Sequence, residues 1–152
     1  MKRIVILALL LVLVFCMAGC VKEPVIKVGM TQEEYKAYEV LSCFPYVFLK
    51  DEDYYYVGER VTNDFEERKL EKVTAIKAFR PKKDAIMQVK NGMTVVELVK
   101  VMGLPESTSG SGMIYLNYPI GDDGKHYYSI GLSITELGKP DMSVGNIFLV
   151  NK

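Results

Sequence analysis

Few residues of this chain have the type and spacing that catalysis requires. His126 is the only histidine, so it alone could serve a Ser-His-Asp triad, and no histidine cluster is available to hold zinc. It also falls at the start of an expected strand, on the apolar face, where a packed or strand-edge histidine is more common than a catalytic one. We therefore predict no catalytic residue, no metal site and no cofactor, and a protein that is not an enzyme.

Two other patterns could bind ligands but have simpler explanations. Residues 107–112 are rich in Ser and Gly, yet they lack the lysine and the following helix of a phosphate-binding loop, so a flexible loop is expected. Acidic residues gather in two turns without the spacing of a calcium-binding loop, and turn preference explains them. They are Asp51, Glu52, Asp53, Asp122 and Asp123.

The first 19 residues have the layout of a secretory signal peptide. Lys2 and Arg3 precede an apolar run of eleven residues, 4–14, which is too short to cross a bilayer core of roughly 30 Å comfortably. The ending Met17-Ala18-Gly19-Cys20 resembles a bacterial lipobox, with Met in place of the usual Leu. That resemblance implies cleavage before Cys20, followed by lipidation of the thiol and acylation of the new amino terminus. An uncleaved anchor, or an ordinary signal with a chance cysteine, is the alternative.

A lipidated chain would sit on the extracytoplasmic side of the cell membrane or the outer membrane. Val21 follows Cys20, so the Asp that retains lipoproteins in the inner membrane is absent, which favours the outer membrane in a cell that has one. Residues 20–27 would form a short tether. Cys43 is then the last free cysteine; its apolar neighbours indicate a small buried residue and not a nucleophile.

The charges give no sign of a nucleic-acid partner. Without Lys2 and Arg3 the chain keeps 17 basic and 19 acidic residues, and they are interspersed, with no basic stripe and no polybasic block.

Residues 20–152 suit one body that buries about two-thirds of its unfolded surface. We expect lipid contact through acylated Cys20, and binding to another envelope protein.

A six-residue segment occurs twice and indicates a repeated unit. Gly29-Met30-Thr31-Gln32-Glu33-Glu34 returns sixty-three residues later as Gly92-Met93-Thr94-Val95-Val96-Glu97. In each copy the Thr and the Glu three residues later form a capping box, and the Met forms a hydrophobic staple with Tyr35 or Leu98. The Gly permits a tight entry with unusual φ. The second helix is expected over residues 95–102, ending at Gly103, and the first one turn longer, ending near residues 42–45.

After each helix the apolar period changes from 3.6 to 2. Strands are expected over 46–49, 54–61 and 73–79 in the first unit, and over 113–118, 125–134 and 146–150 in the second. Residues 86–89 could add a short strand, and 79–83 link the copies. The prediction is an α+β fold with two tandem units, 28–80 and 87–152. Each is a helix followed by a three- to four-stranded antiparallel meander, and the two pack as one body.

The second unit resembles a known family. Val89-Lys90-Asn91-Gly92-Met93-Thr94, Val99, Gly103-Leu104-Pro105 and Ile114-Tyr115-Leu116-Asn117-Tyr118 together resemble the SmpA/OmlA (BamE-like) lipoprotein domain over residues 87–152, and more weakly over 26–79. The resemblance implies the helix-then-meander fold and a role in envelope assembly, with no catalytic residue. A tandem pair of such units is similar to the β-lactamase inhibitory protein architecture, in which a concave sheet surface binds another protein.

Tyrosine is the one unusual component. The chain has ten tyrosines and no tryptophan. Strand alternation places Tyr115 and Tyr127 on the outer face of the second sheet, and at least one ring of Tyr54-Tyr55-Tyr56 away from the helix side. We take Tyr54, Tyr56, Tyr115 and Tyr127 as candidate partner-binding residues, because exposed tyrosine is an effective interface anchor. The alternative is that tyrosine simply suits strands.

Two functions follow from these patterns. The first is a membrane-anchored, non-catalytic protein-interaction module of the cell envelope, assembly- or inhibitor-like. The second is an envelope enzyme or carrier that binds peptidoglycan or a small ligand, which would need a pocket with convergent polar groups.

Overall fold

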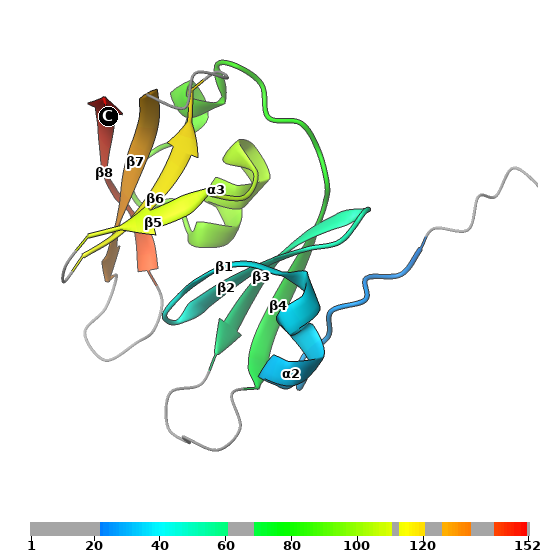
Figure 1. Cartoon of the computed structure of the whole chain (residues 1–152). Helices are drawn as coiled ribbons and strands as arrows, with labels where there is room; N and C mark the ends of the chain where they lie inside the picture. The colour runs from blue at the N-terminus through cyan, green and yellow to red at the C-terminus, as the bar shows by residue number, and fades with distance from the viewer. Residues whose placement is uncertain (1–21, 61–68, 111–112, 121–125, 135–141, 152) are drawn as a thin grey trace, which may run out of the picture.

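The protein is an α+β chain with two four-stranded antiparallel sheets, each preceded by a short helix (Figure 1). This computed structural model describes residues 22–60, 69–110, 113–120, 126–134 and 142–151. The signal peptide, Cys20 and the turn with Asp122 and Asp123 lie outside the described residues. None of the described helices is long and apolar enough to cross a membrane.

Both units have the same order of elements. The first consists of α2 (Gln32–Tyr35), the 3-10 helix η1 (Lys36–Tyr38), β1 (Glu39–Cys43), β2 (Tyr46–Lys50), β3 (Tyr54–Arg60) and β4 (Leu70–Lys77). A second 3-10 helix, η2 (Ala85–Gln88), follows the link. The second unit consists of α3 (Val95–Met102), β5 (Ser107–Ser109), β6 (Ile114–Pro119), β7 (His126–Ile134) and β8 (Met142–Asn151). Each sheet is a meander with neighbours in sequence order, β1-β2-β3-β4 and β5-β6-β7-β8.

The repeated segment forms the helix entrance predicted for it. Gly29 and Gly92 have φ of 89° and 86°, where a side chain would be strained. The Thr31 and Thr94 amides donate to the Glu34 and Glu97 carboxylates at 2.7 and 2.8 Å, and the Glu97 amide donates to Thr94 Oγ1 at 3.2 Å. The capping boxes are therefore confirmed in both copies.

Each entrance is also tied to the last strand of its own sheet. The Gly29 amide donates to the Leu70 carbonyl at 2.8 Å, and the Leu70 amide donates back to Met30 at 3.0 Å. In the second unit, Gly92 donates to Val144 at 2.8 Å and Val144 to Met93 at 2.7 Å. The short sequence echo thus marks one three-dimensional arrangement that occurs twice.

Three expectations about the elements were wrong. The first helix is not one turn longer than the second: it ends at Tyr38, and Glu39–Cys43 is a strand paired with β2. Ser107–Ser109 is a strand paired with β6 and not a flexible loop. The possible strand at 86–89 is η2, whereas the four strands of each unit agree with the three to four that were expected. Leu41 and Cys43, two residues apart, both pack into the core that contains α3, so a contact with the other unit overrides the local helical pattern.

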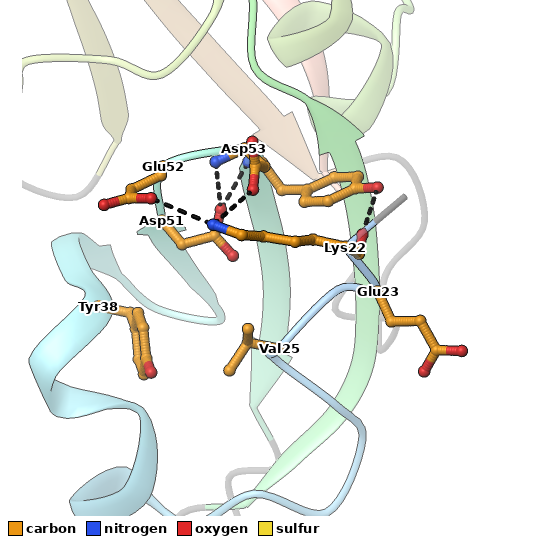
Figure 2. Close-up of a pocket in the computed structure, with 8 residues that line it drawn as sticks. Lys22, Glu23, Val25, Tyr38, Asp51, Glu52 and Asp53 are labelled. Atoms are coloured by element: carbon orange, nitrogen blue, oxygen red, sulfur yellow. Dashed lines mark hydrogen bonds and ion pairs between the residues drawn. The ribbon is translucent and has the colours of Figure 1, made fainter. Parts of the chain in front are cut away.

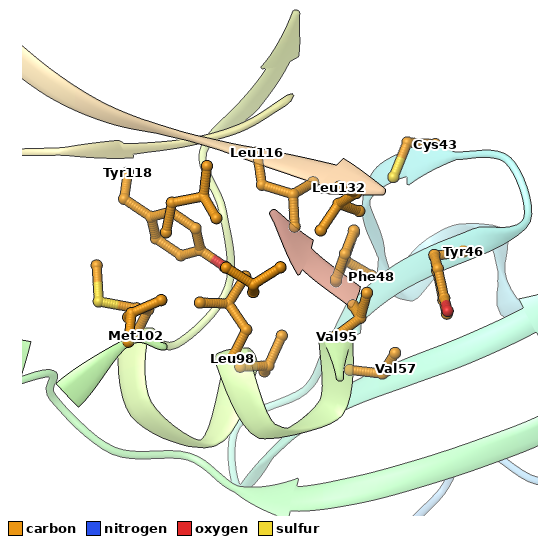
Figure 3. Close-up of a cluster of buried hydrophobic side chains, with 14 of the residues drawn as sticks. Cys43, Tyr46, Phe48, Val57, Val95, Leu98, Met102, Leu116, Tyr118 and Leu132 are labelled. Carbon is orange, nitrogen blue, oxygen red and sulfur yellow. The ribbon is translucent and has the colours of Figure 1, made fainter. Parts of the chain in front are cut away.

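The first sheet is buried on both faces. Phe48 and Val57 point into a core that also contains Val95 and Leu98 of α3 and Leu116 of β6 (Figure 3). On the opposite face Val47, Leu49 and Tyr56 pack with Tyr35 of α2 and with Ile26, which precedes the first helix. This explains why β2 is apolar at four consecutive positions, Tyr46 to Leu49.

The helix α3 lies between the two sheets. It contacts β3 of the first sheet and β8 of the second, and its apolar residues Val95, Leu98, Val99 and Met102 are buried. The order of layers is the N-terminal segment with α2, the first sheet, α3 and the second sheet (Figure 1). The second sheet's face away from α3 is consequently the outer surface of that side.

Candidate functional site

The candidate tyrosines fall into two groups at different places. Tyr54 and Tyr56 point to the α2 side of the first sheet, and Tyr115 and Tyr127 to the outer face of the second. Tyr56 is 0% exposed, so its prediction as a surface anchor was wrong: it lies on the α2 side of the strand, where α2 and the N-terminal segment cover it, and Tyr55 is the ring turned away from α2. Tyr55, on the other face, donates to the Phe79 carbonyl at 2.9 Å, and its ring lies tilted against the Phe79 ring with the centroids 5.8 Å apart.

The hydroxyl groups of Tyr54 and Tyr56 hold the N-terminal segment. Tyr54 Oη donates to the Lys22 carbonyl at 3.1 Å, and the Val25 amide donates to Tyr56 Oη at 3.1 Å. Tyr56 in turn donates to Asp51 Oδ2. Residues 20–27 were expected to form a tether, but the part described here, from Lys22 onward, is bound to the fold.

Asp51 organises the turn between β2 and β3. Its Oδ1 accepts from the amides of Asp53 and Tyr54 at 2.7 and 2.6 Å, and its Oδ2 accepts from Tyr56. Burial would raise the pKa of Asp51, but the hydrogen bonds from Tyr56 and from the two amides outweigh it and hold the pKa below 3.8. Burial, and then the hydrogen bond to Asp51, raise the pKa of Tyr56 to about 12.

A pocket of about 340 Å³ lies beside this turn (Figure 2). The Lys22 ammonium lies 3.3 Å from the Glu52 carboxylate and 3.5 Å from that of Asp53, and these ion pairs raise the pKa of Lys22. Tyr38 and Val25 form part of the apolar wall. The volume is at the low end for small-ligand pockets, and three of its lining carboxylates, Asp51, Glu52 and Asp53, already have partners within the protein.

The outer face of the second sheet has a polar centre with aromatic rings beside it. Asn117 donates to Ser107 and Ser109 at 3.2 and 3.3 Å and accepts from Ser129 at 2.9 Å. These bonds cross three strands and stiffen the face. Beside them, the rings of Tyr115 and Phe148 are 6.0 Å apart, and Phe148 is 45% exposed.

The edge strand β8 carries three consecutive exposed apolar residues, of which Phe148 lies on the outer face and Ile147 and Leu149, paired with Ile130 and Tyr128, lie on the opposite face. Ile147, Phe148 and Leu149 are all exposed, and residues 146–151 carry no charge. The corresponding strand β4 of the first unit carries Glu71, Lys72 and Lys77, the kind of charge that protects a sheet edge from pairing. The sequence analysis did not select Phe148, although alternation along its expected strand at 146–150 was the available signal.

The described residues hold no metal-binding group of three or more His, Cys, Asp or Glu side chains. His126 starts β7 at an exposed position. Cys43 is buried, and burial raises the pKa of its thiol to about 11, so it is a packed residue and has little thiolate at neutral pH. Neither of these side chains lines the pocket beside Asp51.

Comparison with known proteins adds no relative: no family model, curated protein or solved structure matches the chain.

Proposed function

We propose that this protein is a lipid-anchored, non-catalytic protein-interaction module of the bacterial cell envelope. Its anchor is Cys20, acylated after removal of residues 1–19, and its folded part lies on the extracytoplasmic side of the cell membrane or outer membrane. The lipobox-like sequence before Cys20 supports the anchor, and the resemblance to BamE-like domains supports an assembly- or inhibitor-like role.

One observation carries the interaction role: the same face of the repeated unit is covered in one copy and open in the other. In the first sheet, the face turned away from its own helix α2 packs against α3 and the second unit. In the second sheet, the equivalent face carries Tyr115 and Phe148 and has no such cover among the described residues, although Asn117 at its centre is only 7% exposed. An open surface of this kind is suited to a further protein.

The composition of the open face favours a partner that binds reversibly. Its centre is polar, with Asn117 hydrogen-bonded to each of Ser107, Ser109 and Ser129, and its aromatic residues stand at the side. A mixed surface with rigid tyrosine rings resembles a transient interface more than an obligate one.

We regard the two units as one rigid platform for that face. Their shared core and the hydrogen bond from the Met142 amide to Tyr46 Oη, 3.1 Å long, support this. A platform that does not flex keeps the Tyr115 and Phe148 rings in place before a partner arrives, which lowers the entropy cost of binding.

The test is a crosslinked pull-down from membranes with Cys20 intact, followed by affinity measurements on the captured protein. We expect Tyr115→Ala, Tyr127→Ala and Phe148→Ala each to weaken binding about tenfold or more. Phe44→Ala is the matched control, because Phe44 is exposed to a similar degree, 51%, but lies in the turn after β1. Unchanged affinity in all three variants would remove this face as the interface.

A small-ligand carrier is the second candidate, and the pocket beside Asp51 favours it. Soluble peptidoglycan fragments would then raise the melting temperature of the wild type but not that of Tyr38→Ala, because Tyr38 lines the pocket. No shift in the wild type would leave the interaction module as the better account.

A further inference from the structure

The segment before the first helix is part of the folded body. Ile26 is 3% exposed and packs with Tyr35, Tyr56 and Leu70 in the core on the α2 side of the first sheet. A buried side chain six residues after Cys20 leaves little chain free to act as a tether.

Three attachments hold this segment along its length. At its start the Lys22 carbonyl accepts from Tyr54, in the middle the Val25 amide donates to Tyr56, and at its end Ile26 is buried. The Lys22 ammonium adds ion pairs with Glu52 and Asp53, which are exposed and contribute little on their own. We call residues 22–26 the strap.

The distance from the strap to the proposed lipid attachment is short. Consecutive Cα atoms are about 3.8 Å apart, so the Cα of Cys20 lies within about 8 Å of the Cα of Lys22. A free tether of eight residues could reach roughly three times as far.

We propose that the strap fixes the orientation of the protein on a lipid bilayer, with the β2–β3 turn at the headgroups and the open face of the second sheet directed away. This inference rests on the acylation of Cys20 in the proposed function. Val25 within the strap and Val28 just after it are exposed aliphatic residues, and they would then meet the interfacial region, where apolar side chains are tolerated. Figure 1 shows the first sheet and α3 lying between the strap and the second sheet.

The orientation is measured by quenching on vesicles. The full chain, acylated in a bacterial host, is reconstituted in phosphatidylcholine vesicles that carry a headgroup nitroxide. A fluorophore is attached through Glu52→Cys in the β2–β3 turn, or through Met87→Cys, which is 82% exposed on η2. Cys43 is buried and resists labelling. We expect the label at position 52 to be quenched several-fold more than the label at position 87.

Matched tyrosine variants test whether the strap causes this orientation. The double variant Tyr54→Phe/Tyr56→Phe removes the two hydroxyl groups that bond to the strap. It should reduce the difference in quenching between the labels at positions 52 and 87. It should also speed amide exchange of Val25 by about fivefold or more, the equivalent of one lost hydrogen bond. Tyr55→Phe, which removes a hydroxyl that does not touch the strap, should leave the quenching difference and the Val25 amide exchange rate unchanged.

Failure of the proposed orientation can be distinguished from failure of the proposed lipid anchor. Equal quenching at positions 52 and 87 in an acylated chain would overturn the strap orientation and leave the anchor intact. Fast exchange of the Val25 amide in the wild type would show that the strap is not bound, whether or not lipid is attached. A chain that carries no acyl mass on Cys20 counts against the proposed anchor, and with it the orientation.

Discussion

Three consecutive tyrosines in β3 have three different contacts. Tyr54 and Tyr56 hold the strap through their hydroxyl groups, while Tyr55 faces the second unit and bonds to Phe79. Alternation along a strand predicts which rings share a face. It does not tell which face is covered, because the cover comes from Ile26 and Tyr35, distant in sequence from β3.

The Asp51 carboxylate bonds to the β2–β3 turn and to Tyr56 of β3, which in turn holds the strap. The contribution of its charge to the stability of the fold can be measured. Asp51→Asn keeps an oxygen for the two turn amides but loses the acceptor for Tyr56. We expect unfolding free energy to fall by about 1 to 2 kcal/mol at pH 7 in urea titrations. Asp53→Asn, which loses only an exposed ion pair to Lys22, should change it by less than about 0.5 kcal/mol.

The difference in unfolding free energy between the wild type and Asp51→Asn should change with pH in a definite direction. The folded pKa of Asp51 is lowered from 3.8, so its contribution is complete above about pH 4 and is lost as pH falls through the folded value. The gap between wild type and Asp51→Asn should therefore close in acid. The nearby charged and titratable groups are Lys22, Glu52, Asp53 and Tyr56. A gap that is constant from pH 7 to pH 2 would show that the Asp51 charge does not matter.

At the scale of elements, the two helix entrances are one arrangement followed by helices of different length. The Gly-Met-Thr segment, its capping box and its bonds to the last strand recur, yet α2 has four residues and α3 has eight. The longer helix is the one buried between two sheets, in keeping with the rule that tertiary packing stabilises short helices more than propensity does.

The cap of α3 should be worth a measurable part of the stability. Thr94→Ala removes the acceptor for the Glu97 amide, and we expect a loss of about 1 kcal/mol in chemical denaturation. Thr94→Ser keeps the oxygen and should be nearly neutral. If Ala and Ser behave alike, the hydroxyl does not cap the helix.

How far the sequence predicts an element depends on where its stabilising contacts lie. α3 was predicted with correct bounds because its cap, its apolar period and Gly103 are all local. β1 was missed because Leu41 and Cys43 are stabilised by the second unit, and β5 because Ser107–Ser109 has polar residues and gains its structure by pairing with β6. In the candidate site, the outer position of Tyr115 could be predicted, whereas the burial of Tyr56 could not.

At the scale of the whole molecule, α3 joins the two units into one core. Its residues pack with Phe48 and Val57 of the first sheet and with Leu116 and Ile130 of the second. Each unit alone would be near the size at which a domain becomes marginal. The two should therefore unfold together, and the open face of the second sheet should stay rigid until the whole protein unfolds.

Leu98→Ala tests this cooperativity. Truncating this buried side chain should cost about 2 to 5 kcal/mol, and hydrogen exchange should increase in β3 and β7 alike. Met87→Ala, at an exposed position, should have little effect. If exchange increases in the second sheet alone, the units are independent.

The central claim is that the outer face of the second sheet binds a partner in the envelope. It is tested most directly by placing a photoreactive amino acid at position 115, 127 or 148 of the acylated protein in living cells, with position 44 as the matched exposed control. The account predicts that all three face positions crosslink to the same protein and that position 44 does not. Crosslinks from position 44 but none from the three face positions would contradict it.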